Sequence, residues 1–106
     1  MTREEILAMR PGVELNLLVC EKVFDNKTFG SVKPYSTDIS AVWRVLRKLR
    51  EEYWCIEIKI ADTCLVTMEL LRTPPIKVEV GAGTSFDRLP EAICKAALLA
   101  KLRARK

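Results

Sequence analysis

Residues 54–80 read WCIEIKIADTCLVTMELLRTPPIKVEV, and this segment contains three short runs in which apolar and polar residues alternate. The runs cover residues 54–60, 66–70 and 76–80. Because successive side chains of a β-strand point to opposite faces, each run has the pattern of a strand with one apolar face. The breaks between the runs are short enough only to reverse the chain. The segment therefore predicts a three-stranded antiparallel meander.

A sheet of this size needs helices over its apolar face, and the flanking sequence supplies them. Thr2 and Glu5 have the spacing of a capping box, which predicts a short helix before Pro11. Apolar spacing predicts a second helix over residues 13–24, a third that starts after a cap at Ser36 or Thr37, and a last one ending near residue 103. We therefore expect one α+β domain over residues 1–106, in the order ααα-βββ-α.

The two later helices carry patterns that predict how they pack. In the third helix an apolar stripe is expected to face the sheet, and in the last helix four alanines would allow close contact with the sheet. The stripe consists of Ile39, Val42, Trp43, Leu46, Leu49 and Tyr53, and the alanines are Ala92, Ala96, Ala97 and Ala100.

The second face of the predicted sheet is polar, which favours two layers or a second helical layer that covers it only partly. The residues expected on this face are Glu57, Lys59, Thr67, Glu69, Lys77 and Glu79.

The composition bounds the class of protein. Of 106 residues, 49% are hydrophobic and 30% are charged, which is typical of a globular domain. No apolar run is long enough to cross a membrane and the start is unlike a signal peptide, so we expect a cytoplasmic protein without membrane contact. The four cysteines lack metal-ligand spacing, so buried free thiols are expected, with no metal and no cofactor.

The chain also lacks the residue patterns from which a catalytic site could be assembled. Histidine is absent, and the sequence shows neither a nucleophile motif nor paired carboxylates on the apolar framework. The sequence therefore predicts a protein that is not an enzyme.

Three segments resemble one known family. The start at residues 2–15 followed by residues 19–23, the segment PYSTDISAVW at residues 34–43, and the ending LPEAICKAALLA at residues 89–100 are similar to the phage ABA sandwich domain. This resemblance implies a small α/β sandwich encoded by a phage or prophage, with no established activity. The family name suggests helices on both sides of the sheet, whereas the polar second face departs from that expectation.

Two candidate sites follow from the residues. Hydroxyl groups at the start of the third helix, next to basic residues on its outer side, could bind an anionic ligand; they could also be a helix cap and a solvated face. These residues are Tyr35, Ser36, Thr37, Arg44, Arg47 and Lys48. The turn before the last helix could hold an anion through Gly83, Thr84, Ser85 and Arg88, or be a plain connection.

We therefore expect a non-catalytic binding module for a host protein or a small anionic molecule. The alternative is a nucleic-acid-binding protein that uses the basic face of the third helix. A formal net charge of +4 is compatible with either function.

Overall fold

The computed structural model describes residues 2–24, 32–60, 63–71, 73–80 and 88–104. Its elements follow the predicted order of three helices, three strands and one helix, which confirms the α+β class. They are α1 (Arg3–Ala8), α2 (Val13–Lys22), α3 (Ile39–Glu51), β1 (Cys55–Ile60), β2 (Cys64–Glu69), β3 (Ile76–Val80) and α4 (Leu89–Ala104). The predicted capping box of α1 is present, with both hydrogen bonds between Thr2 and Glu5.

The three strands form the predicted antiparallel meander, in the order β1-β2-β3. Ile58 pairs with Val66, which pairs in turn with Val78. Val66 and Val78 are buried, as the alternating pattern predicts, whereas Ile58 on the edge strand β1 is only half-buried. The apolar face of the sheet is therefore filled at β2 and β3 but less completely at β1.

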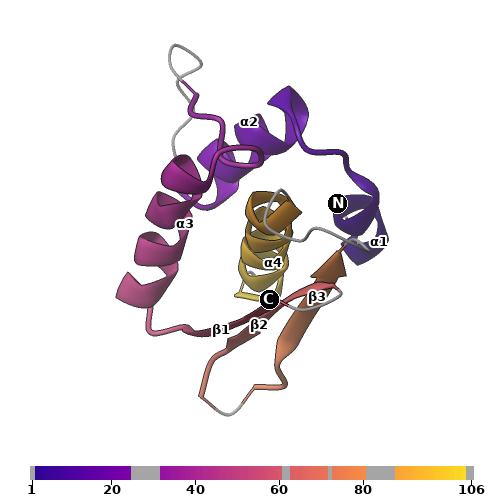
Figure 1. Cartoon of the computed structure of the whole chain (residues 1–106). Helices are drawn as coiled ribbons and strands as arrows, with labels where there is room; N and C mark the ends of the chain where they lie inside the picture. Colours follow the sequence, from indigo (N-terminus) through magenta and orange to yellow (C-terminus); the bar gives the residue numbers. More distant parts are fainter. Residues whose placement is uncertain (1, 25–31, 61–62, 72, 81–87, 105–106) are drawn as a thin grey trace.

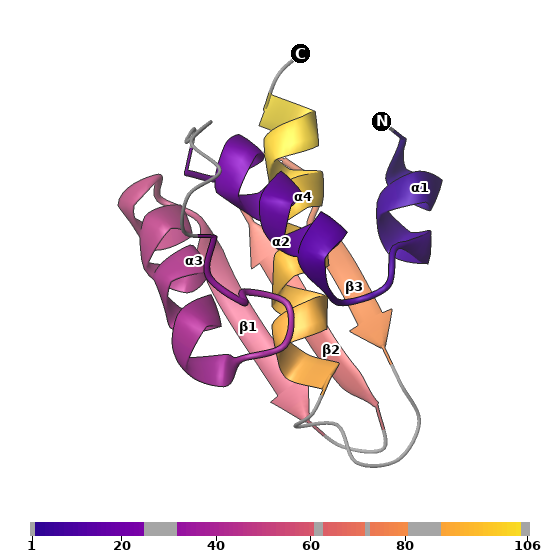
Figure 2. The ribbon, with the colours of Figure 1, turned by 90° about the horizontal axis from the view of Figure 1, so that it is seen from above.

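Helix α4 lies at the centre of the molecule. Every residue from Leu89 to Ala100 is buried. Figures 1 and 2 show the sheet on one side of α4, α2 on the other, and α1 and α3 alongside it. The four alanines predicted to allow close contact are fully buried. The sequence did not indicate that α4 would be covered on all sides, because helices with alanine on several faces are also common at the surface.

The described helices all lie on the apolar side of the sheet (Figure 1). On the opposite side, Glu57, Lys59, Glu69, Lys77 and Glu79 are exposed, as their alternating positions predict, whereas Thr67 on the central strand of the same face is buried. Within the described residues, no helix covers that polar face. The layers are therefore the sheet, then α4 between α1 and α3, and then α2.

Helix α3 is rotated relative to the predicted stripe. Val42, Leu46 and Leu49 are buried as expected, but Ile39 and Trp43 are 40% and 54% exposed. The buried side of α3 is centred on positions 45 and 49. Ile39 and Trp43 therefore lie on one flank of the helix, beside the buried face.

The predicted end of the stripe lies beyond the helix. Helix α3 ends at Glu51, and Tyr53 adopts a φ of 70° with 82% of its surface exposed. The amides of Tyr53 and Trp54 donate to the carbonyl oxygens of Arg50 and Leu49, which is the Schellman arrangement of a helix C-terminus. Helix α2 likewise ends at Lys22, short of the predicted residue 24.

All four cysteines are free thiols. Cys20, Cys64 and Cys94 are buried, but Cys55 is exposed, so the prediction of buried cysteines is wrong for Cys55. Its position on β1 explains the difference, since Cys55 shares the polar face with Glu57. None of the described helices is long and apolar enough to span a membrane.

Candidate functional site

The chain reaches α3 through a turn between Pro34 and Asp38. The amides of Thr37 and Asp38 donate to the carbonyl oxygen of Pro34, at 3.2 and 2.9 Å. Asp38 is the N-cap of α3, and its Oδ1 accepts a hydrogen bond from the Ser40 amide at 2.9 Å. Asp38 therefore has the capping role that the sequence predicted for Ser36 or Thr37.

Ser36 is directed into the protein rather than toward solvent. Its Oγ accepts a hydrogen bond from the Gly12 amide at 2.8 Å and donates to Oδ1 of Asn16 at 2.6 Å. Its own amide donates to the same Asn16 oxygen at 2.8 Å. Ser36 is 1% exposed, so its hydroxyl joins the turn before α3 to the start of α2.

Tyr35 is also buried. Its ring stacks on Phe24 with the ring centroids 5.2 Å apart. Burial raises the pKa of Tyr35, and among nearby groups Cys20 raises it further while the positive charge of Arg44 lowers it. Tyr35 thus packs beneath the start of α3, within electrostatic reach of Arg44.

The predicted basic residues of α3 divide into two kinds. Arg44 and Arg47 are exposed, and no ion pair or side-chain hydrogen bond within the described part of the chain involves them. Lys48 is half-buried, with its Nζ 3.9 Å from a carboxylate oxygen of Glu52. Glu52 also accepts a hydrogen bond from Lys101 of α4. Two of the three predicted cations therefore face solvent, together with Thr37.

The second predicted anion site falls mostly outside the described residues, where Gly83, Thr84 and Ser85 lie. Arg88 is described, and its Nε and Nη2 donate to the two carboxylate oxygens of Glu91, each at 3.2 Å. Arg88, which was predicted to bind an anion, therefore already binds the carboxylate of Glu91 through two hydrogen bonds.

Comparison with models of known protein families identifies the family of this chain. A family model for the phage ABA sandwich domain matches residues 4–98, which include every described helix and strand except the first residue of α1 and the end of α4. The chain belongs to the phage ABA sandwich domain family. No curated protein and no solved structure matches it. The family name indicates a phage protein with a sandwich fold, and it specifies no function.

This phage ABA sandwich protein has a buried ion pair that the sequence pattern did not predict. Glu91 and Lys95 of α4 are 2% and 3% exposed, and their side chains meet at 2.6 Å. Lys95 also donates to the carbonyl oxygen of Leu7 at 2.9 Å, which attaches the end of α1 to α4. The signal in the sequence was an acid and a base four residues apart in a helix rich in alanine and leucine.

The environment of Glu91 fixes its charge. Burial raises the pKa of its carboxyl, but hydrogen bonds from Arg88 and Lys95, together with their positive charges, outweigh burial, so the pKa is lowered. Glu91 is therefore ionised at neutral pH and binds both Arg88 and Lys95, and it is Lys95 that binds α1.

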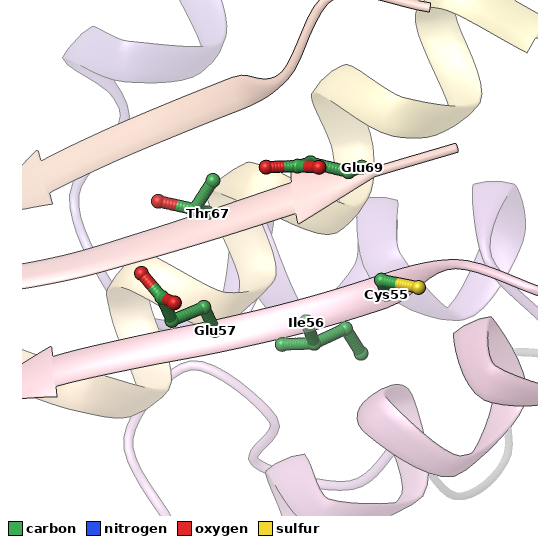
Figure 3. A pocket seen from close by; sticks show the side chains of 5 residues that line it. All are labelled: Cys55, Ile56, Glu57, Thr67 and Glu69. Carbon is green, nitrogen blue, oxygen red and sulfur yellow. The ribbon is translucent and has the colours of Figure 1, made fainter. Parts of the chain in front are cut away.

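A shallow hollow of about 240 Å³ lies on the polar face of this phage ABA sandwich protein, away from α3. It is lined by Cys55, Ile56, Glu57, Thr67 and Glu69. Figure 3 shows the lining side chains coming from the neighbouring strands β1 and β2. Two carboxylates in the lining make the hollow unfavourable for an anion. No group of three or more acidic or cysteine side chains in the described residues is placed to hold a metal ion.

Proposed function

We propose that this phage protein is a non-catalytic binding module that docks an acidic surface of a host protein through the outer face of α3. The observation that supports this function is the exposure of Arg44 and Arg47 without carboxylate partners among the described residues. Arg88, Lys95 and Lys101 are each paired with a glutamate, whereas Arg3, Arg10, Lys59 and Lys77 are also exposed without an ion pair among the described residues, but not as two arginines one helical turn apart. The outer face of α3 thus holds two arginines without an ion-pair partner among the described residues, and exposed Glu51, one turn beyond Arg47, is the carboxylate on the same side.

Arginine at an exposed helix face suits such a surface for physical reasons. The guanidinium group is planar and always charged, and it binds carboxylates through two parallel hydrogen bonds. Arg44 and Arg47 are three residues apart, so they are neighbours on the same side of α3. Their backbone positions are fixed, because the opposite side of α3 is held in the core by buried Val45 and Leu49.

The shape of the basic face favours a macromolecule over a small ligand. Sites for small molecules are usually concave. The described hollow lies on the other side of the sheet and is lined by Glu57 and Glu69. In the described part of the chain, Arg44 and Arg47 lie on an exposed helix surface and not in this hollow, and the surface of a protein could cover both.

The experiment compares three tagged proteins in a lysate of the bacterial host. They are the wild type, the double variant Arg44→Ala/Arg47→Ala, and a control, Arg3→Ala/Arg10→Ala, which removes two exposed arginines near the N-terminus. Quantitative mass spectrometry should find a host protein retained by the wild type and the control but lost from the α3 variant. If all three proteins retain the same set equally, the outer face of α3 is not the docking surface.

Nucleic acid is a second candidate, and the exposure of two aromatic residues favours it. Trp43 and Tyr53 are 54% and 82% exposed, whereas the apolar stripe of the third helix predicted both to be buried. Bases of single-stranded nucleic acid stack on exposed aromatic rings next to basic residues. Fluorescence anisotropy with a labelled single-stranded oligonucleotide tests this function, since binding should weaken steeply with salt and in the Arg44→Ala/Arg47→Ala variant. Absence of binding at low salt would remove nucleic acid from consideration.

A further inference from the structure

Strand β1 forms one edge of the sheet. The strand order is β1-β2-β3, so β2 lies between the other two strands. No described strand pairs with the outer side of β1. An edge strand presents backbone N–H and C=O groups with which another extended segment can pair.

Helix α3 lies along this edge on the apolar side of the sheet (Figure 2). Glu52, which pairs with α4, marks the side of α3 that faces α4. Helical geometry places Trp43 on the opposite side, with Ile39 one turn earlier. Arg50 shares this side, and its Nη1 donates to the carbonyl oxygen of Trp54, just before β1, at 2.9 Å. Ile39 and Trp43 therefore lie on the flank of α3 next to the β1 edge.

The apolar side chains at this edge are incompletely covered. Ile39 and Trp43 of α3 are 40% and 54% exposed, and Ile60 of β1 is 38% exposed. Ile56 and Ile58 are half-buried, although the residues that face them on β2 are fully buried. An extended segment beside β1 would cover this apolar surface and also satisfy the free edge.

The charges on β1 define which segment fits. Glu57 and Lys59 are exposed on the polar face, and neither forms an ion pair within the described residues. In an antiparallel pairing, opposite charges directly across from each other are favourable. The added strand would need an acidic residue opposite Lys59, a basic residue opposite Glu57, and apolar residues opposite Ile56, Ile58 and Ile60. Read from its N-terminus, the required pattern is apolar–acidic–apolar–basic–apolar.

We propose that the β1 edge beside α3 docks an extended segment of a partner protein with this pattern, by antiparallel strand addition. A whole second copy paired along β1 would bring a second α3 to the side of the sheet that α3 already occupies (Figure 2), whereas a single extended segment would not. This docking does not depend on Arg44 or Arg47. It is a second surface, separate from the basic face of α3.

Strand β1 itself has the required pattern, because residues 56–60 read Ile-Glu-Ile-Lys-Ile. A fluorescent peptide with this sequence, flanked by solubilising residues, is therefore a suitable probe. It should bind the wild-type protein, and Lys59→Glu should weaken binding about tenfold by placing two acids opposite each other. A peptide with lysine in place of its glutamate should restore binding to the Lys59→Glu protein. The control Lys77→Glu makes the same charge change on β3 and should leave binding unchanged.

Tryptophan emission gives a second measurement. Trp43 is 54% exposed and Trp54 is 3% exposed, so covering the α3 flank should shift the emission to shorter wavelength through Trp43 alone. The shift should be absent in the Trp43→Phe variant. In the same variant the unlabelled peptide should still displace the fluorescent peptide from the β1 edge.

Four results would overturn this proposal, three with the peptide and one with the unliganded chain. The peptide could fail to bind the wild type, or bind equally well to Lys59→Glu. Binding to Lys59→Glu could also remain weak with the charge-swapped peptide. Sedimentation should show that the unliganded chain is monomeric; self-association abolished by Lys59→Glu would instead identify a second copy as the occupant. Because Arg44 and Arg47 lie outside this edge, failure here would leave the basic face of α3 unaffected as a docking surface.

Discussion

Ser36 follows Tyr35 at the start of a helix, and from the sequence alone its hydroxyl could bind either a ligand or the chain itself. In the structure the hydroxyl contacts Gly12 and Asn16, residues that are distant in the sequence. Such contacts depend on how α2 and α3 pack, so local sequence patterns could not predict them. Arg44 and Arg47, in contrast, are exposed as the helical pattern predicted.

Replacement of Ser36 with Ala tests its internal role. The variant should lower the free energy of unfolding by about 1–3 kcal/mol, because the Gly12 amide and Asn16 lose a buried hydrogen-bond partner. Thr37→Ala, at the exposed neighbouring position, should change it by less than about 0.5 kcal/mol. Urea unfolding of both variants measures the difference. Equal changes in the free energy of unfolding for the two variants would show that the buried hydrogen bonds of Ser36 stabilise the protein no more than an exposed hydroxyl does.

The buried pair of Glu91 and Lys95 makes stability depend on pH. The pKa of Glu91 lies below its ordinary value of 4.5 in the folded protein, so the unfolded chain binds a proton first as the pH falls. Stabilisation by Glu91 is therefore complete above that ordinary value and is lost as the pH falls through the lower folded pKa. Glu91→Gln should cost about 3 kcal/mol at neutral pH, because it leaves Lys95 buried without a charged partner.

Urea unfolding of the wild type and Glu91→Gln across acid pH checks the sign of this effect. The two proteins should converge in stability at low pH, where Glu91 of the wild type is also neutral. A difference in the free energy of unfolding that stays constant from neutral to acid pH would contradict this account of the pair.

At the scale of elements, period-two alternation predicted the three strands well, because one polar and one apolar face impose it directly. The helices were harder to place. In α3 the stripe drawn through Ile39, Trp43 and Tyr53 was wrong, because helical periodicity gives the spacing of a face but not which neighbours cover its flanks. In α4 the apolar residues surround the helix, and only the assembled fold shows that α2 covers the side away from the sheet.

The left-handed backbone of Tyr53 predicts a stabilising substitution at the end of α3. Tyr53→Gly should raise the free energy of unfolding by about 0.5–1 kcal/mol, because glycine adopts this φ without steric strain and the exposed ring contributes little packing. Tyr53→Ala removes the ring but keeps the strain, so it should show no such gain in thermal or urea unfolding. A stabilisation of the same size in both variants would attribute the effect to the ring.

The close packing of α4 predicts that larger side chains are not tolerated there. Ala96 is fully buried, so Ala96→Leu should destabilise the protein by about 1–3 kcal/mol through overpacking. The same change at exposed Ala8, at the end of α1, should have little effect on thermal unfolding. An unchanged melting temperature in Ala96→Leu would show that α4 is less tightly enclosed than the structure indicates.

For the whole molecule, the sequence predicted the fold class, the order of elements and the family, since each depends on local pattern or on segments in a fixed order. The sequence also predicted the exposed basic residues of α3. It did not predict the proposed docking edge of β1, because that edge requires the flank of α3 to lie beside the outermost strand of the sheet. The polar hollow was missed for the same reason, since its residues come from two strands paired through the register.

The central proposal is that the outer face of α3 binds an acidic host protein. The most direct measurement is the affinity of the captured host protein for the three proteins compared above, by titration calorimetry at low and moderate salt. We predict that Arg44→Ala/Arg47→Ala binds at least about tenfold more weakly than the Arg3→Ala/Arg10→Ala control at low salt, and that its affinity depends less on salt. Equal affinities and equal salt dependence for the two double variants would contradict the proposal.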